Sequence, residues 1–198
     1  MRTKRTRFIA VGAVVVVGLV ASVGVAWATH VPTSAIARLI DTNGRPSGTV
    51  TFQPVEGKMS ISANVLLPRE FAGFHGFHMH RVGQCDPAAV DPATGQRVPF
   101  FSSSGHLGSE DGHAHGVHDG DMPPLLVNRD GSARVTFRTD HVSFDRLFDA
   151  DGTAVLIHLG RDNLANIPAR YAPNGPDAAT LATGDSGPRT VCGVVTRS

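Results

Sequence analysis

The residues most able to do chemistry in this chain are two histidines separated by one position, His78 and His80. Side chains alternate between the two faces of a β-strand, so both imidazoles are expected to point the same way. Gly76, just before them, would allow another part of the chain to approach closely. Two neighbouring imidazoles can begin a metal site, but an isolated pair is more often a surface or half-buried feature. The remaining histidines therefore decide the interpretation.

A loop rich in histidine offers one set of further ligands. Such tracts can bind metal by composition alone, so a solvated loop that binds metal loosely is one interpretation. The spacing favours a more specific one, because His115, His118 and Asp121 place two imidazoles and a carboxylate within seven residues. With His106 they supply three nitrogens and one oxygen, a tetrahedral set suited to zinc. His113 is an alternative to His115, since both lie at a plausible distance from His106.

A second set offers nitrogen only. His158 lies in a short apolar segment and can join His78 and His80. Imidazole nitrogen without thiolate, in a planar or tetragonal arrangement, suits Cu(II). Three further histidines lack suitable spacing and are not expected to bind metal: His30, His75 and His141.

Short strands are the elements that must position these side chains. Alternating or short apolar runs predict strands at 35–40, 49–52, 59–66, 125–128, 133–137, 154–159 and 191–195, besides the segment with His78 and His80. Two long segments rich in glycine and proline, 86–121 and 160–189, interrupt the strands, and loops of that length usually carry function. No internal repeat or useful helical stripe occurs. About eight short strands predict an all-β sandwich or barrel.

The N-terminal segment has the pattern of a signal for export. Four basic residues precede an apolar run that begins at Phe8, and Ala26-Trp27-Ala28 is a small-x-small cleavage pattern. We expect a signal peptide at 1–28, a linker at 29–34 and one folded domain at 35–198. The apolar run of about 20 residues is also long enough to be retained as a membrane anchor. Both alternatives place the domain outside the cytoplasm, in the periplasm, in the cell envelope or in the medium.

Charge excludes one class of partner. Removal of residues 1–28 takes away four of the 18 basic groups and none of the 17 acidic groups, which leaves a net charge of −3 with neutral histidines. No basic stripe is present, so nucleic acid is not an expected partner.

Cys85 and Cys192 are the only cysteines, and both lie in the exported part. In an oxidising compartment such a pair is most simply a disulfide, and the alternative is two unpaired buried thiols.

The order of these motifs resembles that of the copper–zinc superoxide dismutase family, in its bacterial exported form. The matching segments are Gly76-Phe77-His78-Met79-His80, Gly105-His106, His115-Gly116, His118-Asp119-Gly120-Asp121-Met122-Pro123, Ile157-His158 and Arg189-Thr190-Val191-Cys192-Gly193-Val194-Val195. The resemblance covers residues 36–195. It implies a Greek-key β-sandwich or flattened barrel of antiparallel strands with two long functional loops. It also implies an enzyme that converts superoxide to O₂ and hydrogen peroxide with one copper and one zinc per chain.

The same resemblance implies a role for each ligand. Copper would be bound by His78, His80, His106 and His158, and zinc by His106, His115, His118 and Asp121. His106 would thus be an imidazolate shared by both metals, and it would also take up a proton during turnover.

Other residues receive roles from the resemblance as well. Arg189 would guard the channel to copper, although a surface pair with Asp185 is the simpler reading without the family. Asp162 would join a copper-site and a zinc-site histidine through hydrogen bonds, although it is also a plausible turn residue. Cys85 and Cys192 would form the family disulfide.

Three features depart from the family pattern. His115 and His118 are only three residues apart, the segment from Cys85 to His106 is long, and a lysine-rich loop is missing, with Lys58 the only lysine after the leader. Attraction of anionic superoxide would therefore depend on arginines, with Arg161, Arg170 and Arg189 as candidates.

Two competing functions remain open at this point: a non-catalytic copper- or zinc-binding protein on the same fold, and a copper-only dismutase whose zinc site is empty. The sequence also leaves open whether the protein is a homodimer.

Overall fold

A computed structural model describes residues 34–198 of this chain. The predicted signal peptide, the alternative membrane anchor and nearly all of the predicted linker lie outside the described residues and stay predictions. Within the described part, no helix is long and apolar enough to cross a bilayer.

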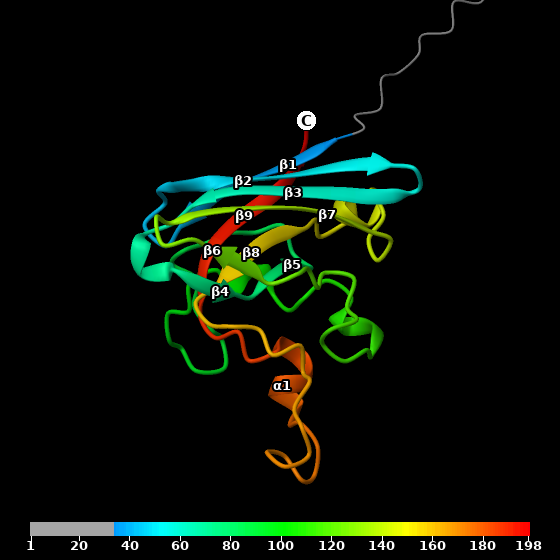
Figure 1. The fold of residues 1–198 in the computed structure, drawn as a ribbon. Coiled ribbons are helices and arrows are strands. Elements are labelled where there is room, and N and C mark those ends of the chain that lie inside the picture. The colour runs from blue at the N-terminus through cyan, green and yellow to red at the C-terminus, as the bar shows by residue number, and fades with distance from the viewer. Residues whose placement is uncertain (1–33) are drawn as a thin grey trace, which may run out of the picture. The chain divides into compact units, whose positions relative to one another are not determined.

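The described residues form nine β-strands, one short α-helix and four 3₁₀ helices (Figure 1). The strands are β1 (Ala35–Asp41), β2 (Pro46–Val55), β3 (Lys58–Leu66), β4 (Gly73–His75), β5 (Phe77–His80), β6 (Leu125–Val127), β7 (Ser132–Thr139), β8 (Ala154–His158) and β9 (Arg189–Arg197). The helix α1 spans Ala178–Thr183, and the 3₁₀ helices span Arg69–Phe71, Phe101–Ser103, Ser109–Asp111 and Arg146–Phe148.

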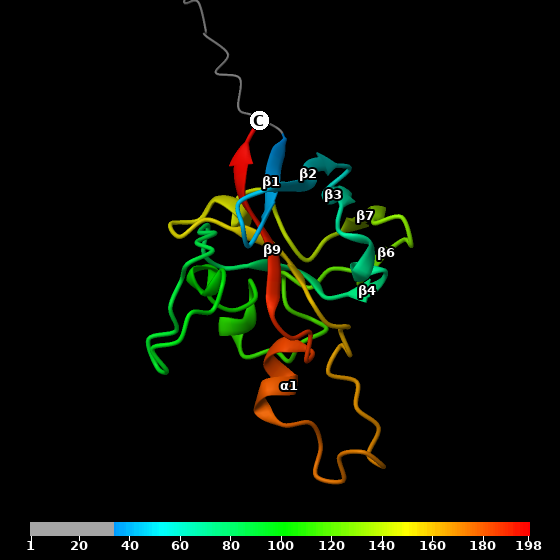
Figure 2. The same ribbon diagram turned by 90° about the vertical axis from the view of Figure 1, so that its left-hand side faces the viewer.

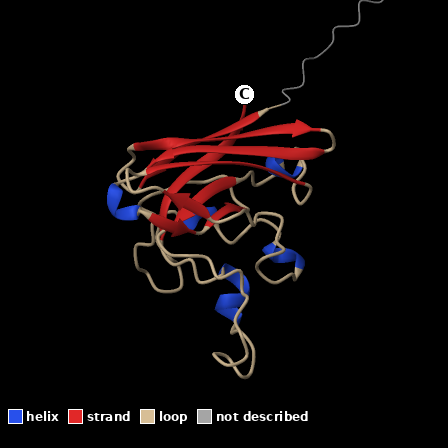
Figure 3. Ribbon diagram, viewed as in Figure 1, coloured by secondary structure: helices blue, strands red, loops and turns tan. Residues whose placement is uncertain are grey.

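Seven strands make one antiparallel sheet in the order β5-β8-β9-β1-β2-β3-β7, and β4 pairs with β6 in a small second sheet. Three neighbouring pairs, β5–β8, β9–β1 and β3–β7, are not consecutive in the chain, so the connections cross the fold. Figure 3 shows that the strands gather in one half of the described part, while long loops and the helix α1 lie in the other. The predicted all-β fold with two long loops is confirmed.

Alternation of side chains explains why the strands bury one face. In β3, Met59, Ile61, Ala63 and Val65 are buried, and the residues between them face outward. These side chains share a single apolar core with residues from the other end of the sheet, such as Phe77 of β5. The sheet must therefore curl around this core, as the two perpendicular views in Figures 1 and 2 show. Each fully buried large side chain stabilises this arrangement by about 1.5–3 kcal/mol.

The second long loop contains one element that the sequence did not reveal, the six-residue helix α1. The Asp177 carboxylate accepts a hydrogen bond from Thr180 N at 2.8 Å and caps its first turn. Gly184 ends the helix with φ 59°, a left-handed conformation that favours glycine. The helix is too short for an apolar stripe to be visible in the sequence.

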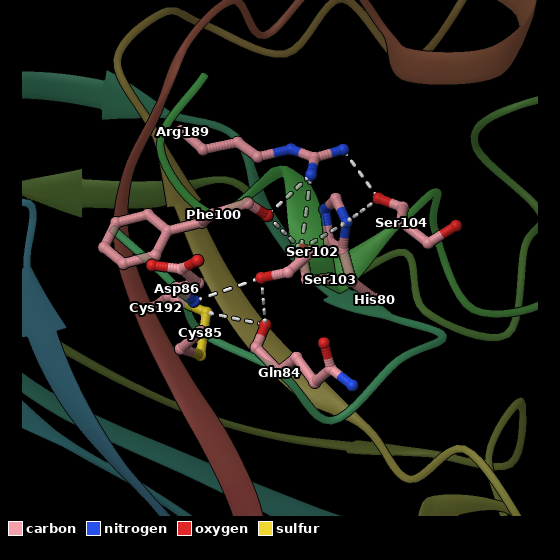
Figure 4. The surroundings of a disulfide bond; sticks show 10 residues. All are labelled: His80, Gln84, Cys85, Asp86, Phe100, Ser102, Ser103, Ser104, Arg189 and Cys192. Atoms are coloured by element: carbon pink, nitrogen blue, oxygen red, sulfur yellow. Dashed lines mark hydrogen bonds between the residues drawn. A yellow bond between two sulfur atoms is a disulfide. The ribbon is translucent and has the colours of Figure 1, made fainter. Parts of the chain in front are cut away.

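Cys85 and Cys192 form a disulfide, as expected. It joins the loop after β5 to the last strand, and its Cα atoms are 5.7 Å apart (Figure 4). Asp86 N donates a hydrogen bond to Ser102 Oγ at 3.1 Å, which holds the loop beside the disulfide.

The disulfide closes a loop of 107 residues, so its loss is expected to lower the free energy of unfolding. The chain-entropy model gives about 4–5 kcal/mol for a loop of this length. Urea unfolding of Cys192→Ser against the oxidised wild type measures the difference. The reduced wild type should resemble the variant, and equal stability of oxidised and reduced protein would contradict the prediction.

Candidate metal centre

Strands β5 and β8 place three histidines together. His78 and His80 lie on β5, which pairs with β8, and His158 ends β8. All three imidazoles are almost completely buried. Gly76 has the predicted role, because a Cβ at this position would overlap Ser186 Oγ of the second long loop. The loop can therefore pack directly against the start of β5.

The first long loop lies along the outer edge of β5. Met79 N donates to Gly120 O at 2.8 Å, and Leu107 N donates to Met79 O at 2.9 Å. The loop closes on itself there, because Gly120 N donates to Leu107 O at 2.8 Å. His106 and Asp121 are consequently held beside the histidines of β5, with bridge-type pairing of His80 to His106 and of His78 to Asp121.

Four buried histidines form the first group of possible metal ligands: His78, His80, His106 and His158. One ring nitrogen from each lies within 4.8 Å of the others. Main-chain carbonyls orient two of the rings, since His80 Nδ1 lies 2.8 Å from Ser104 O and His158 Nδ1 lies 2.9 Å from Gly187 O. A carbonyl can only accept, so each Nδ1 carries the proton. The two Nε2 atoms are left with lone pairs and lie 3.4 Å apart.

The second group contains His78, His106, His115 and Asp121, again within 4.8 Å. His115 Nδ1 lies 3.0 Å from Asp121 Oδ1, and His106 Nδ1 lies 3.2 Å from the same oxygen. His118 is not one of these four, but its Nδ1 lies 3.5 Å from Asp121 Oδ2. Both groups thus contain His78 and His106, although the sequence led us to expect His106 alone as the shared residue.

Three buried ring nitrogens have no hydrogen-bond partner among the described residues: Nδ1 of His78, of His115 and of His118. Buried polar atoms are nearly always paired, so an orphaned nitrogen needs an explanation. All three belong to the predicted ligands and face the two groups. The donor set therefore fits copper in the nitrogen-only group and zinc in the group with a carboxylate.

Asp162 accepts hydrogen bonds from one histidine of each ligand group. Its carboxylate accepts from His78 Nε2 at 2.5 Å and from His115 Nε2 at 2.8 Å. Leu164 N donates to the same carboxylate at 2.7 Å. Burial opposes the ionised carboxylate, but hydrogen bonds from His115 and His78 hold the pKa of Asp162 well below its usual range. Each imidazole then presents its Nδ1 to the metal.

Burial also sets the charge of the rings. It lowers the pKa of His158 to about 3 and that of His106 to about 4, with neighbouring histidine charges in the same direction. These rings are neutral at pH 7, which is the form that binds metal. For His115, burial is outweighed by the adjacent carboxylates of Asp121 and Asp162, which raise the pKa to about 9.

Arg189 lines a cavity of about 440 Å³ together with His80, His106 and His158. Its guanidinium donates to Phe100 O at 2.8 Å and to Ser104 O at 2.6 Å (Figure 4). Burial lowers the pKa of Arg189 to about 10, so the side chain remains charged at neutral pH. Its hydrogen-bond partners are neutral oxygens, and it forms no ion pair in the described part, although Asp185 also lines the cavity.

Comparison with known proteins agrees with this geometry. Residues 46–195 match the profile described as "Copper/zinc superoxide dismutase (SODC)". The chain is 43% identical over 163 residues to "Superoxide dismutase [Cu-Zn]" of Mycolicibacterium paratuberculosis, with 77% of this chain and 70% of the relative covered. The chain belongs to the copper/zinc superoxide dismutase family.

Two further relatives support the assignment to this family. "Superoxide dismutase [Cu-Zn]" of Mycobacterium bovis is 38% identical over 168 residues, covering 82% of this chain and 70% of the relative. The solved structure "Cu/Zn superoxide dismutase from Brucella abortus" superposes with a TM-score of 0.63 at 26% identity, covering 81% of this chain and 98% of that chain. The family resemblance seen in the sequence is confirmed.

The alternatives raised for single residues can now be compared with the structure. Asp185 accepts from Asn163 and Thr180 rather than from Arg189, so the surface pair with Arg189 is not formed. His113 lies in neither ligand group, although its carbonyl accepts from His118 Nε2 at 2.8 Å.

The three arginines proposed to attract superoxide occupy different parts of the described structure. Arg189 lines the cavity beside His80, His106 and His158, whereas Arg161 lines a separate cavity beside His75. Arg170 instead lies over the exposed ring of Tyr171, 4.8 Å from its centroid. Of the three arginines, only Arg189 faces the cavity.

Several functional atoms were missing from the sequence analysis. The carbonyls of Ser104 and Gly187 set which nitrogens of His80 and His158 are free. Every residue has a carbonyl, so no residue type marks these positions.

Asp162→Asn is expected to weaken zinc binding by about 10- to 100-fold, because the amide is uncharged and its NH₂ group would face an N–H donor where a carboxylate oxygen now accepts. Zinc affinity is measured by competition with a chromophoric chelator. Asp140→Asn, at an exposed carboxylate paired only with Lys58 in the described part, is the matched control. Zinc binding of Asp162→Asn equal to that of the control would show that Asp162 is only a turn residue.

Proposed function

We propose that this chain dismutes superoxide to O₂ and hydrogen peroxide, with copper and zinc in adjacent sites. The ligands of copper are His78, His80, His106 and His158, and those of zinc are His106, His115, His118 and Asp121. One observation carries the proposal. Buried ring nitrogens without a hydrogen-bond partner converge on the two adjoining ligand groups.

The proposed shared imidazole is His106, because of the number of ring nitrogens that each candidate has free for a metal. His78 donates its Nε2 to Asp162 and has only Nδ1 left for a metal. His106 places Nδ1 beside Asp121, on the zinc side, while its ring also lines the cavity with His80 and His158. His106 therefore has one nitrogen available toward each ligand group, whereas His78 would offer its single free nitrogen to copper.

His118 completes the zinc set in this proposal. Its Nδ1 is buried, has no hydrogen bond in the described part and lies on the side of Asp121 Oδ2. The short spacing between His115 and His118 is accommodated because Asp121 Oδ2 accepts from both Gly116 N and His118 N, at 2.6 and 3.0 Å. These bonds fold the segment tightly around one carboxylate.

When bound, copper supplies the one-electron redox chemistry, and zinc, which has no redox chemistry, helps to fix the ligands. The chain supplies binding and the proton. Arg189 attracts the anion and offers N–H donors to it at the cavity wall. His106 takes up a proton at Nε2 and passes it on as peroxide forms.

We also propose that the protein works outside the cytoplasm after export through residues 1–28. The disulfide supports this location, because such bonds persist in oxidising compartments.

Metal analysis of the purified domain, with superoxide decay measured before and after chelation, tests the proposal. Copper and zinc at one each per chain, with activity lost on chelation and restored by copper with zinc, are expected. Bound copper without activity would support the non-catalytic binder instead. Activity with copper and no zinc would support the copper-only dismutase.

Arg189→Gln is expected to lower kcat/KM by about 10-fold or more, because the cavity loses the positive charge of Arg189. Copper content should be unchanged, since Arg189 is not a ligand, and the dependence of the rate on salt should weaken. Arg161→Gln is the matched control, because Arg161 does not line this cavity. A loss of rate as large in the control would contradict the role of Arg189.

A further inference from the structure

The zinc ligands His115 and His118 lie in a closed part of the first long loop, residues 108–119, which we call the zinc subloop. Its neck is the pairing of Leu107 with Gly120 on the edge of β5. Between these ends, only one main-chain hydrogen bond of the described part joins the zinc subloop to another element, from His115 N to Leu181 O at 2.7 Å. The main chain alone therefore holds two zinc ligands with little support.

The zinc subloop also carries an unbalanced charge. It contains three carboxylates, Glu110, Asp111 and Asp119, and neither lysine nor arginine. Carboxylates are good zinc ligands, so a loop of this composition beside a zinc site has several ways to bind the metal.

Arg146 contacts all three of these carboxylates. Its Nη2 lies 2.6 Å from Glu110 Oε1 and 3.8 Å from Asp111 Oδ2, and its Nε lies 3.4 Å from Asp119 Oδ2. A fourth carboxylate, Asp149, lies 3.3 Å from Nη1 and is part of the same connection between β7 and β8 as Arg146. The Arg146 side chain is 30% exposed.

The base of Arg146 is rigid. It begins the 3₁₀ helix Arg146–Phe148, in which Leu147 is fully buried in the main core. Arg146 N donates to Ser143 Oγ at 3.2 Å. A planar guanidinium with five N–H donors on a fixed base can hold several carboxylates at once, whereas a lysine ammonium offers only three donors on a flexible side chain.

We propose that Arg146 is a positioning residue of the zinc site. It binds the three carboxylates of the zinc subloop, which fixes His115 and His118 at the metal and keeps Glu110, Asp111 and Asp119 turned away from it. A single exposed ion pair contributes little, but here one cation joins four carboxylates from two connections. The inference rests on the zinc site proposed above.

The test compares zinc binding in wild type, Arg146→Gln, Arg146→Lys and Arg138→Gln. Arg138 is the matched control because it forms a single pair with Glu56, at 3.0 Å, on the exposed side of β7. Zinc affinity is measured by competition with a chromophoric chelator, and the absorption of Co²⁺ bound in place of zinc reports the ligand geometry.

Arg146→Gln is expected to bind zinc about 10-fold more weakly and to alter the Co²⁺ absorption. Arg146→Lys should recover part of the affinity, and Arg138→Gln should match wild type. Wild-type affinity and an unchanged Co²⁺ spectrum in Arg146→Gln would overturn the inference while leaving the proposed function intact. An equal loss in Arg138→Gln would also overturn it, because the effect would then be general. Failure of the wild type to bind zinc would overturn both the zinc site and the role of Arg146.

If Arg146→Gln does not fold, the double variant Glu110→Gln/Asp119→Asn tests the same contacts from the other side. It leaves Arg146 and the buried Leu147 in place. The same weakening of zinc binding is expected, and wild-type affinity in the double variant would overturn the inference.

Discussion

The edge of β5 is the constraint on which the metal centre depends. One face of this short strand supplies His78 and His80, while its free edge receives the first long loop through Met79. The same few hydrogen bonds thus bring His106 and Asp121 to within reach of the strand histidines. Because the strand is buried on all sides, the spacing of these ligands is set by a rigid element rather than by the loops.

The second long loop completes the site by contributing acceptors. Asp162 holds a histidine of each group through Nε2, and Gly187 orients His158. Gly184 lies directly against this arrangement, and a Cβ there would overlap both Asp162 and His115. The two loops therefore meet at Asp162, and a change in one alters the metal ligands carried by the other.

Electrostatics divides the centre into a neutral part and a charged part. Burial keeps His106 and His158 neutral, while the carboxylates of Asp121 and Asp162 remain ionised next to histidine N–H groups. Arg189 adds a positive charge at the cavity, held by two carbonyl oxygens and the Ser103 hydroxyl. Lys58 is the only lysine among the described residues, so the positive charge at this cavity comes from arginine.

The sequence by itself determined the fold class, the family and the disulfide. Alternation in the segment 59–66 predicts a strand with one buried face, and a chain with two cysteines allows a single intramolecular pairing. The types and order of the histidines likewise indicate copper and zinc, because residue type is what metals select.

Only the tertiary structure decided how the atoms of these residues are used. It placed His78 in both ligand groups, left His113 outside them, separated Arg161 from the cavity and brought Arg146 to three carboxylates of the zinc subloop. Each of these outcomes depends on contacts between segments far apart in the chain or on main-chain carbonyls that every residue possesses. Local sequence patterns carry the identity of a side chain, but long-range packing determines which of its atoms are free.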